Sequence, residues 1–168
     1  MFAYGGKILR VNLSDRKVTT KDLDEGLIRN YIGGRGFASR ILYDELKPGI
    51  DPLGAENKIV FASGPLAGLF VPASGKTTLA SKSPATNSYG DSNVGGHLAP
   101  EIKYAGYDVI IIEGKANKPS YIYILSILPG ILIITKIYLS GMGRFYLPDQ
   151  AGIVIQHHTK TLIPDSSI

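Results

Sequence analysis

The residues best suited to chemistry lie between positions 74 and 97. Lys76 follows a glycine, and Asn93 precedes Gly95 and Gly96 in a run of small residues. Glycine lets a backbone come close to a bulky ligand because it has no Cβ and tolerates positive φ angles. Backbone amides and the lysine could therefore bind an anion, while carbonyl groups and the Asn93 side chain could hold a hard cation such as magnesium. The alternatives are a solvated surface lysine and a turn in which Asn93 bonds its own backbone.

The run Ser74–Thr78 is similar to the end of a phosphate-binding P-loop but lacks two of its features. The P-loop pattern needs a glycine five residues before Gly75, and that position holds Phe70. It also needs a helix after the lysine, whereas residues 77–84 predict a strand followed by a turn. A nucleotide-binding module is therefore a third hypothesis, which an ATP titration would test.

Arg35 and the histidines are further candidates. Arg35 lies in the run Gly33–Gly36, where its planar guanidinium and the flanking glycines could cradle an anion. The same run is also typical of a corner between two helices that carries a surface arginine. His97 could act as an acid or a base, but a histidine that opens a helix is more often structural. His157 and His158 would point to opposite faces of a strand, so they form a poor chelate.

Short strands dominate the elements that must position these residues. From apolar alternation or continuous β-branched runs, we expect strands at residues 7–14, 18–23, 58–63, 77–82, 108–113 and 120–125. From apolar residues at helical spacing, we expect helices at residues 27–32, 37–46 and 97–104. Either Asp22 or Asp24 can cap the first helix. Asn93 is expected in a loop, and the strand at 108–113 is expected to be covered on both faces, with 120–125 pairing back as another strand. The order predicts an α+β fold with a mostly antiparallel β-sheet and two or three helices.

Composition excludes several classes of protein. The chain has 168 residues, of which 44% are apolar, so it can bury the core of one ordinary domain. Its net charge is only +4 and no basic cluster is interleaved with aromatic residues, so we expect no nucleic-acid partner. Cysteine is absent, which excludes disulfides, thiolate-bound zinc and a cysteine-bound iron–sulfur cluster in this chain. Without a signal peptide, we expect cytoplasmic localisation.

Tyr121 to Leu139 is nearly all apolar and raises the question of a membrane span. Pro129 and Gly130 interrupt the segment, and each half is shorter than the ~20 residues that a spanning helix needs. Two buried strands joined by a turn fit the segment better, so we expect no membrane association.

Several runs, in one order and spacing, resemble a known family. The runs are Y-G-G-K-I-L-R-V-N-L-S, Y-I-G-G-R-G-F, D-P-L-G-A-E-N-K-I-V-F-A-S-G-P-L-A-G, S-K-S-P, G-D-S-N-V-G-G-H-L-A-P-E-I-K-Y-A-G-Y-D-V-I-I-I-E-G-K-A and K-P-S-Y-I-Y-I. From about Tyr4 to Ile124 they resemble the N-terminal domain of the tungsten-containing aldehyde ferredoxin oxidoreductases. The resemblance implies a base of two similar β-rich halves on which a bis-pterin cofactor lies.

The resemblance also implies a reaction and a set of cofactors. Enzymes of this family oxidise an aldehyde to the carboxylic acid and pass the electrons to ferredoxin. Tungsten, or molybdenum, is held by the dithiolene sulfurs of two pterins, magnesium links the pterin phosphates, and a [4Fe-4S] cluster lies beside them. Later, mainly helical domains supply the cluster cysteines and the acid and base groups. No catalytic residue is therefore expected in this chain.

The cofactor contacts that the resemblance implies fall on Lys76, Asn93 and Gly95. The resemblance implies that the residue at the position of Asn93 contacts the magnesium ion that links the pterin phosphates. Lys76 takes the place of the family's usual arginine, so it keeps the positive charge but loses the bidentate fork.

The likeness ends after about Ile124, and we expect two parts in the chain. Residues 1–125 would be an incomplete pterin-binding N-terminal domain, and residues 126–168 an apolar tail outside the family pattern. The tail either reflects a frameshift or a truncated gene, or it is a diverged segment that completes the sheet. Two functions follow: a cofactor-binding part of an aldehyde-oxidising enzyme, inactive without the missing domains in trans, or a non-catalytic remnant or binding module without metal cofactor. Exposed apolar surface beside the missing half predicts self-association, so a homo-oligomer is possible, and ferredoxin is a partner only of a complete enzyme.

Overall fold

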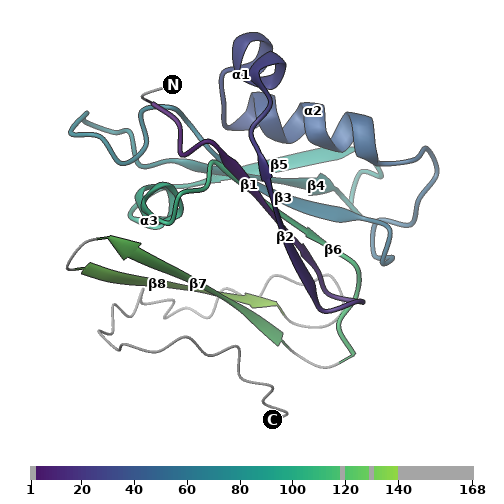
Figure 1. Ribbon diagram of the computed structural model, residues 1–168. Helices are drawn as coiled ribbons and strands as arrows, with labels where there is room; N and C mark the ends of the chain where they lie inside the picture. The colour runs from purple at the N-terminus through teal and green to yellow at the C-terminus, as the bar shows by residue number, and fades with distance from the viewer. Residues whose placement is uncertain (1–2, 118–119, 129–130, 140–168) are drawn as a thin grey trace.

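The computed structural model describes residues 3–117, 120–128 and 131–139 (Figure 1). Its helices are α1 (Glu25–Tyr31), α2 (Arg35–Glu45) and α3 (Leu98–Tyr104). Its strands are β1 (Lys7–Asn12), β2 (Lys17–Asp22), β3 (Lys58–Ser63), β4 (Thr77–Lys82), β5 (Tyr89–Val94), β6 (Val109–Glu113), β7 (Ser120–Leu128) and β8 (Ile131–Leu139). Strands and helices therefore occur in the order expected of an α+β fold.

Strands β1 to β6 form one sheet in the order β2-β1-β6-β3-β4-β5. Strands β1 and β6 pair in parallel, and the other four pairings of this sheet are antiparallel. The prediction of a mostly antiparallel sheet is thus confirmed. The β-branched run of β6 lies near the middle of the sheet, and its residues from Val109 to Ile112 are at most 3% exposed. The prediction that β6 is covered on both faces, made from its continuous apolar sequence, is therefore confirmed.

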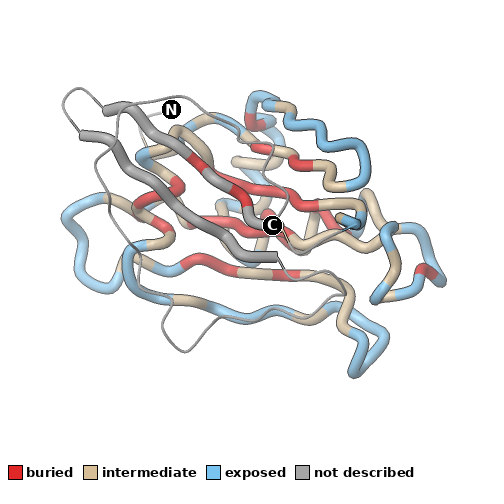
Figure 2. Tube along the Cα trace, turned by 90° about the horizontal axis from the view of Figure 1, so that it is seen from below, coloured by how far each residue is buried: buried red, intermediate tan, exposed pale blue. Residues whose placement is uncertain are grey.

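Two layers cover the sheet, one on each face (Figure 1). Helix α2, preceded by α1, packs on the face that Val60, Ala80 and Ile111 present. Helix α3 and the β7–β8 hairpin cover the other face, which presents Phe61 and Ile110. Figure 2 shows buried residues along the central strands and exposed residues on the surrounding loops.

Helix α1 begins directly after its N-cap residue, Asp24, whose backbone is extended. The Asp24 side chain accepts a hydrogen bond from the backbone N–H of Leu27 at 2.9 Å, so Asp24 rather than Asp22 is the N-cap.

A buried carboxylate fixes the N-terminal segment to the start of β6. Asp108 is 1% exposed and accepts hydrogen bonds from the backbone N–H groups of Gly5 and Gly6 at 3.1 and 2.7 Å. It also forms an ion pair with Lys103 of α3, whose ammonium group donates to the Ala3 carbonyl as well. A single side chain therefore ties together the N-terminal segment, α3 and the sheet.

Four charged side chains form a second cluster, at the end of α2. Arg10 and Lys58 each contact both Glu45 and Glu113, at distances from 2.5 to 2.9 Å. Burial alone would raise the pKa of Glu113, but hydrogen bonds and charge from Lys58 and Arg10 outweigh it and lower that pKa. The pKa of Glu45 is lowered for the same reasons. The cluster therefore favours ionised carboxylates in the folded protein.

Two sequence predictions need correction. Asn93 lies in strand β5, not in a loop, because β4 pairs with the polar run 89–94 along its whole length. Residues 120–125 do form a strand, but that strand pairs with β8, whereas both edges of β6 are already occupied by β1 and β3. The expected pair of apolar strands between Tyr121 and Leu139 is confirmed as β7 and β8. No helix in the described part of the chain is long and apolar enough to span a bilayer. His157, His158 and most of the predicted tail, residues 126–168, lie outside the described residues.

Candidate functional site

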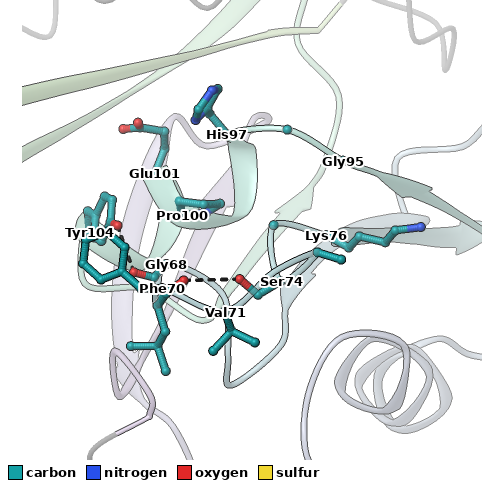
Figure 3. Close-up of a pocket in the computed structure, with 14 residues that line it drawn as sticks. Gly68, Phe70, Val71, Ser74, Lys76, Gly95, His97, Pro100, Glu101 and Tyr104 are labelled. Atoms are coloured by element: carbon teal, nitrogen blue, oxygen red, sulfur yellow. Dashed lines mark hydrogen bonds between the residues drawn. The ribbon is translucent and has the colours of Figure 1, made fainter.

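An open hollow of about 510 Å³ lies between helix α3 and the loop that precedes β4 (Figure 3). The loop contributes residues 68–71 and 73–76, the end of β5 contributes Gly95 and Gly96, and α3 contributes Pro100 and Glu101 among others. The hollow thus gathers the glycine-rich runs that the sequence marked as possible ligand contacts.

Lys76 and Gly95 are brought together at this hollow. Thr77 opens β4 and pairs with Val94, the last residue of β5, so Lys76 and Gly95 flank the end of the same two-stranded ribbon. Lys76 is exposed, and the described residues provide no ion-pair partner for its ammonium group. In Figure 3 its side chain extends away from His97 and Glu101. A free cation beside an exposed glycine is a suitable contact for an anionic group.

Gly75 sets how closely the two sides of the hollow approach. A Cβ at Gly75 would lie 2.6 Å from the carbonyl oxygen of Gly96, which is far inside ordinary contact distance. Gly96 has a φ of +84°, which most side chains do not adopt. By contrast, a Cβ at Gly95 would meet nothing within 4 Å. Gly75 and Gly96 are therefore needed for the backbone conformation and the close approach of the two segments. Gly95 is not needed for either, and its missing side chain leaves space for a ligand.

The Asn93 side chain does not face the hollow. Its Oδ1 accepts a hydrogen bond of 2.9 Å from the hydroxyl of Thr78, the residue opposite it on β4. A Cβ at Gly34 would lie 3.4 Å from the same hydroxyl, so this pair of side chains lies on the α2 face of the sheet. The structure therefore brings Lys76 and Gly95 together but directs the Asn93 amide to the opposite face.

The backbone of Asn93, however, faces the outer edge of β5, with which no described strand pairs. Ser83 N–H donates to the Ser88 carbonyl at 2.7 Å, which makes these two residues a hydrogen-bonded pair of the β4–β5 hairpin. Hydrogen-bonded and non-hydrogen-bonded pairs alternate along an antiparallel ladder. Thr78 and Asn93 are five positions along from that pair, so they form a non-hydrogen-bonded pair whose N–H and C=O groups point outward. Because β5 is the last strand of the six-stranded sheet, the Asn93 carbonyl is turned away from β4.

The Gly33–Gly36 run forms the corner between α1 and α2. Arg35 opens α2, and its Nε lies 2.7 Å from the Asp91 carboxylate on β5. This hydrogen bond and the charge of Asp91 raise the pKa of Arg35. The corner with a surface arginine is therefore what the structure shows, and its guanidinium already has an anionic partner.

Glu101 is a residue of the hollow that sequence reasoning missed. It is only 8% exposed, and its Oε2 atom has no hydrogen-bond partner among the described residues. Burial raises the pKa of the Glu101 carboxyl, and the charge of His97 one helical turn earlier offsets this only in part. His97 itself is exposed and makes no side-chain cap to α3. Within the described ranges, no group of three or more histidine or acidic side chains could hold a metal ion.

Comparisons with known proteins agree on one family. The family model described as "Aldehyde ferredoxin oxidoreductase, N-terminal domain" matches residues 8–128. The tungsten-containing aldehyde ferredoxin oxidoreductase of Pyrococcus horikoshii is 47% identical over 124 residues, which are 74% of this chain and 20% of that protein. The "aliphatic sulfonate oxidoreductase, WOR-like subunit" of Pyrococcus furiosus is 41% identical over 150 residues, 88% of this chain and 23% of that protein.

A solved structure shares the fold. The active site complex BamBC of benzoyl coenzyme A reductase, in complex with 1,5 dienoyl-CoA, is 34% identical with a TM-score of 0.69. The likeness covers 79% of this chain and 20% of that one. The chain thus spans about a fifth of the length of the proteins it matches.

Proposed function

This chain belongs to the aldehyde ferredoxin oxidoreductase family, of which it carries the N-terminal domain, and we propose that it is the tungstopterin-binding portion of such an enzyme. The complete enzyme would oxidise an aldehyde to the carboxylic acid and deliver the electrons to ferredoxin. The chain alone would bind and orient the cofactor without turning over substrate.

The observation that carries this proposal is the position of Lys76 beside Gly95 at the rim of a hollow of about 510 Å³. A pterin cofactor presents a phosphate group and a flat ring, which call for a cation and for a backbone surface without side chains. Lys76 supplies the first and the run Gly95–Gly96 the second, so the donor set fits the group. When bound, the tungsten–pterin group supplies the oxygen-transfer and electron chemistry of the reaction.

The ammonium group of Lys76 would bind the cofactor phosphate as a single positive charge. An ammonium group has three rotatable donors but lacks the fork of a guanidinium, so we expect it to hold a phosphate less rigidly than arginine would. Because Lys76 has no described ion-pair partner, its charge is available without breaking an existing contact.

Asn93 would contact the magnesium ion through its main chain. Its side-chain oxygen already accepts the hydroxyl of Thr78, whereas its carbonyl points to the open edge of β5. A backbone carbonyl is a suitable ligand for a hard cation that keeps most of its waters. We therefore assign the proposed magnesium contact to the carbonyl oxygen, with the side chain positioning the strand.

The electron path requires protein that this chain does not supply. The sequence contains no cysteine, so a cysteine-bound iron–sulfur cluster must come from another polypeptide segment. We propose that the remaining domains, in the same longer chain or in trans, provide the cluster, the ferredoxin contact and the acid and base groups. We also propose cytoplasmic localisation for the assembled enzyme.

Metal analysis of protein purified from a host that makes tungstopterin tests this function. We expect tungsten or molybdenum to copurify with the chain. Lys76→Ala should weaken cofactor binding about tenfold, because a charge-assisted phosphate contact is worth roughly 1.4 kcal/mol, and it should lower the metal content accordingly. Lys17→Ala, on the exposed strand β2, is the matched control and should leave the metal content unchanged.

Absence of metal from the unsubstituted chain would favour the alternative function, a remnant or binding module without metal cofactor. The origin of the tail is a separate question. A chain ending at Leu125 that unfolds at the same temperature as the full chain would support a frameshift or a truncated gene as the origin of residues 126–168. A large loss of stability would contradict that origin and favour a diverged segment that completes the fold.

A further inference from the structure

Strand β5 depends on few contacts within the sheet. It is the last strand in the order β2-β1-β6-β3-β4-β5, so β4 is its only partner among the described strands. Its sequence, YGDSNV, contains glycine, aspartate and asparagine, which are depleted in strands, and none of its residues is buried. Contacts from outside the sheet are therefore needed if the Asn93 carbonyl is to keep a fixed position.

Asp91 and Asn93 supply two polar contacts on the face of the sheet that α2 covers. The two residues are two positions apart on one strand, so their side chains share a face. Asn93 accepts a hydrogen bond of 2.9 Å from the Thr78 hydroxyl, which joins β5 to β4. Asp91 accepts a hydrogen bond of 2.7 Å from the Nε–H of Arg35, which joins β5 to the start of α2. The second contact ties β5 to another layer of the fold.

The Asp91 side chain is largely shielded from water. Asp91 is an exposed residue, yet its side chain is only 17% exposed, so its exposed surface belongs mainly to its main chain. This agrees with peptide groups of β5 that face the outer edge of the sheet. Although the Arg35 side chain is 63% exposed, a partly shielded carboxylate makes the ion pair less sensitive to salt than a pair between two exposed groups.

The corner between α1 and α2 is fixed by backbone contacts. The Gly33 N–H donates to the Tyr31 carbonyl at 2.6 Å, which closes a γ-turn around Ile32. Ile32 has a φ of 63° and a ψ of −54°, the rare and strained form of this turn. The Gly34 N–H donates to the Ser63 carbonyl, at the end of β3, at 3.0 Å. Strain of this kind persists only where surrounding contacts hold it, so the first residue of α2 starts from a fixed position.

We propose that Arg35 and Asp91 are positioning residues of the cofactor site: their ion pair holds β5 against the corner between α1 and α2, so that the Asn93 carbonyl stays in place for magnesium. This inference rests on the proposed function and gives a role to an arginine that the cofactor contacts leave unused. Arg35 acts through Asp91 and not on the cofactor itself.

Hydrogen exchange of the chain without cofactor tests the contact between the corner and β5. The N–H groups of Gly90, Ser92 and Val94 donate to β4, because these residues alternate with the outward-facing ones. Arg35→Ala and Asp91→Ala should each speed exchange at these three amides about fivefold. The double variant should exchange no faster than the single variants, because all three lose the same contact.

Arg29→Ala is the matched control. Arg29 pairs with Glu25 within α1, and its side chain is 70% exposed, close to the exposure of Arg35. It should leave exchange in β5 unchanged. Arg35→Lys should recover most of the slow exchange, because the contact with Asp91 is a single hydrogen bond that an ammonium group can also donate.

Metal analysis of protein from a host that makes tungstopterin tests the positioning role. Removing a residue that orients a metal ligand typically weakens metal binding at least tenfold, so Arg35→Ala and Asp91→Ala should each weaken cofactor binding about tenfold. The content of magnesium and of tungsten or molybdenum should fall accordingly, while the thermal midpoint falls by no more than about 4 °C. Arg35→Lys should recover the metal content, and Arg29→Ala should leave it unchanged.

Three results separate the proposals. Equal exchange in Arg35→Ala and Arg29→Ala would overturn the positioning role. A metal content that Asp91→Ala leaves unchanged or raises would also overturn it, since the freed Arg35 would then serve the cofactor directly or not at all. An unsubstituted chain without metal refutes the proposed function instead, and the exchange measurement, which needs no cofactor, then decides alone whether the ion pair holds β5.

Discussion

Replacing Gly75 by alanine should distort the hollow, because the added Cβ would clash with the backbone on its other side. The added Cβ would lie 2.6 Å from the Gly96 carbonyl oxygen, about 0.8 Å closer than the 3.4 Å at which ordinary contact begins. Neither atom belongs to a flexible side chain, so the loop before β4 and the end of β5 must move apart. Overpacking of this kind costs roughly 1–3 kcal/mol.

An opposing term must be subtracted from this cost. Alanine restricts the unfolded chain more than glycine does, which stabilises a protein by about 0.4–1 kcal/mol wherever the native backbone accepts it. Gly75 is not in the positive-φ region, so Gly75→Ala keeps this gain. The net destabilisation is therefore about 1 kcal/mol, which lowers the thermal midpoint of a chain of this size by roughly 2–4 °C.

The assay compares Gly75→Ala with Gly95→Ala by calorimetry and by metal content. A Cβ at Gly95 meets nothing within 4 Å, so Gly95→Ala should leave the midpoint unchanged or slightly raised. Both substitutions should lower the metal content, Gly75→Ala by separating the two sides of the site and Gly95→Ala by filling space that the ligand needs. If Gly75→Ala melts at or above the temperature of the unsubstituted chain, the close approach of the two backbones is not a real constraint.

Two further predictions concern the charged clusters. The folded-state pKa values of Glu45 and Glu113 are lowered from their ordinary value of 4.5, so both groups stabilise the fold above that pH and lose this contribution as the pH falls below it. Glu113→Gln should therefore cost about 1–2 kcal/mol at pH 7 and flatten the fall in stability below pH 4.5, as urea titrations at several pH values would show; an unchanged acid profile would contradict the assignment. Asp108→Asn should cost about 3–5 kcal/mol, because it leaves the Lys103 ammonium buried without its counter-charge, and it should speed hydrogen exchange at Gly5 and Gly6; slow exchange there would show that another contact holds the N-terminal segment.

The regular elements could be predicted from the sequence because their patterns are local. Alternation in β1 and the continuous run of β6 depend only on which faces are buried, and the cap at Asp24 depends only on its own helix. The position of Asn93 could not be predicted, since the run 89–94 is rich in small polar residues that rarely favour strands. Its pairing with β4 supplies the extended conformation instead.

The candidate site divides in the same way. Glycines next to a lysine indicated the location of the hollow, and Lys76 and Gly95 do lie together there. Glu101 gave no signal, because its burial depends on how the loop around Gly68 folds over α3. The parallel contact between β1 and β6 was equally hidden, since the two strands come from opposite ends of the described sheet sequence.

The outward-facing peptide groups of β5 have a consequence for handling this protein. An unpaired strand edge is a template for adding a strand from another molecule, which is how many proteins begin to aggregate. The carbonyl that we assign to magnesium belongs to that same row of groups, so metal loading and edge-to-edge polymerisation would compete for it. Protein prepared with its cofactor should therefore stay in solution longer than protein prepared without it.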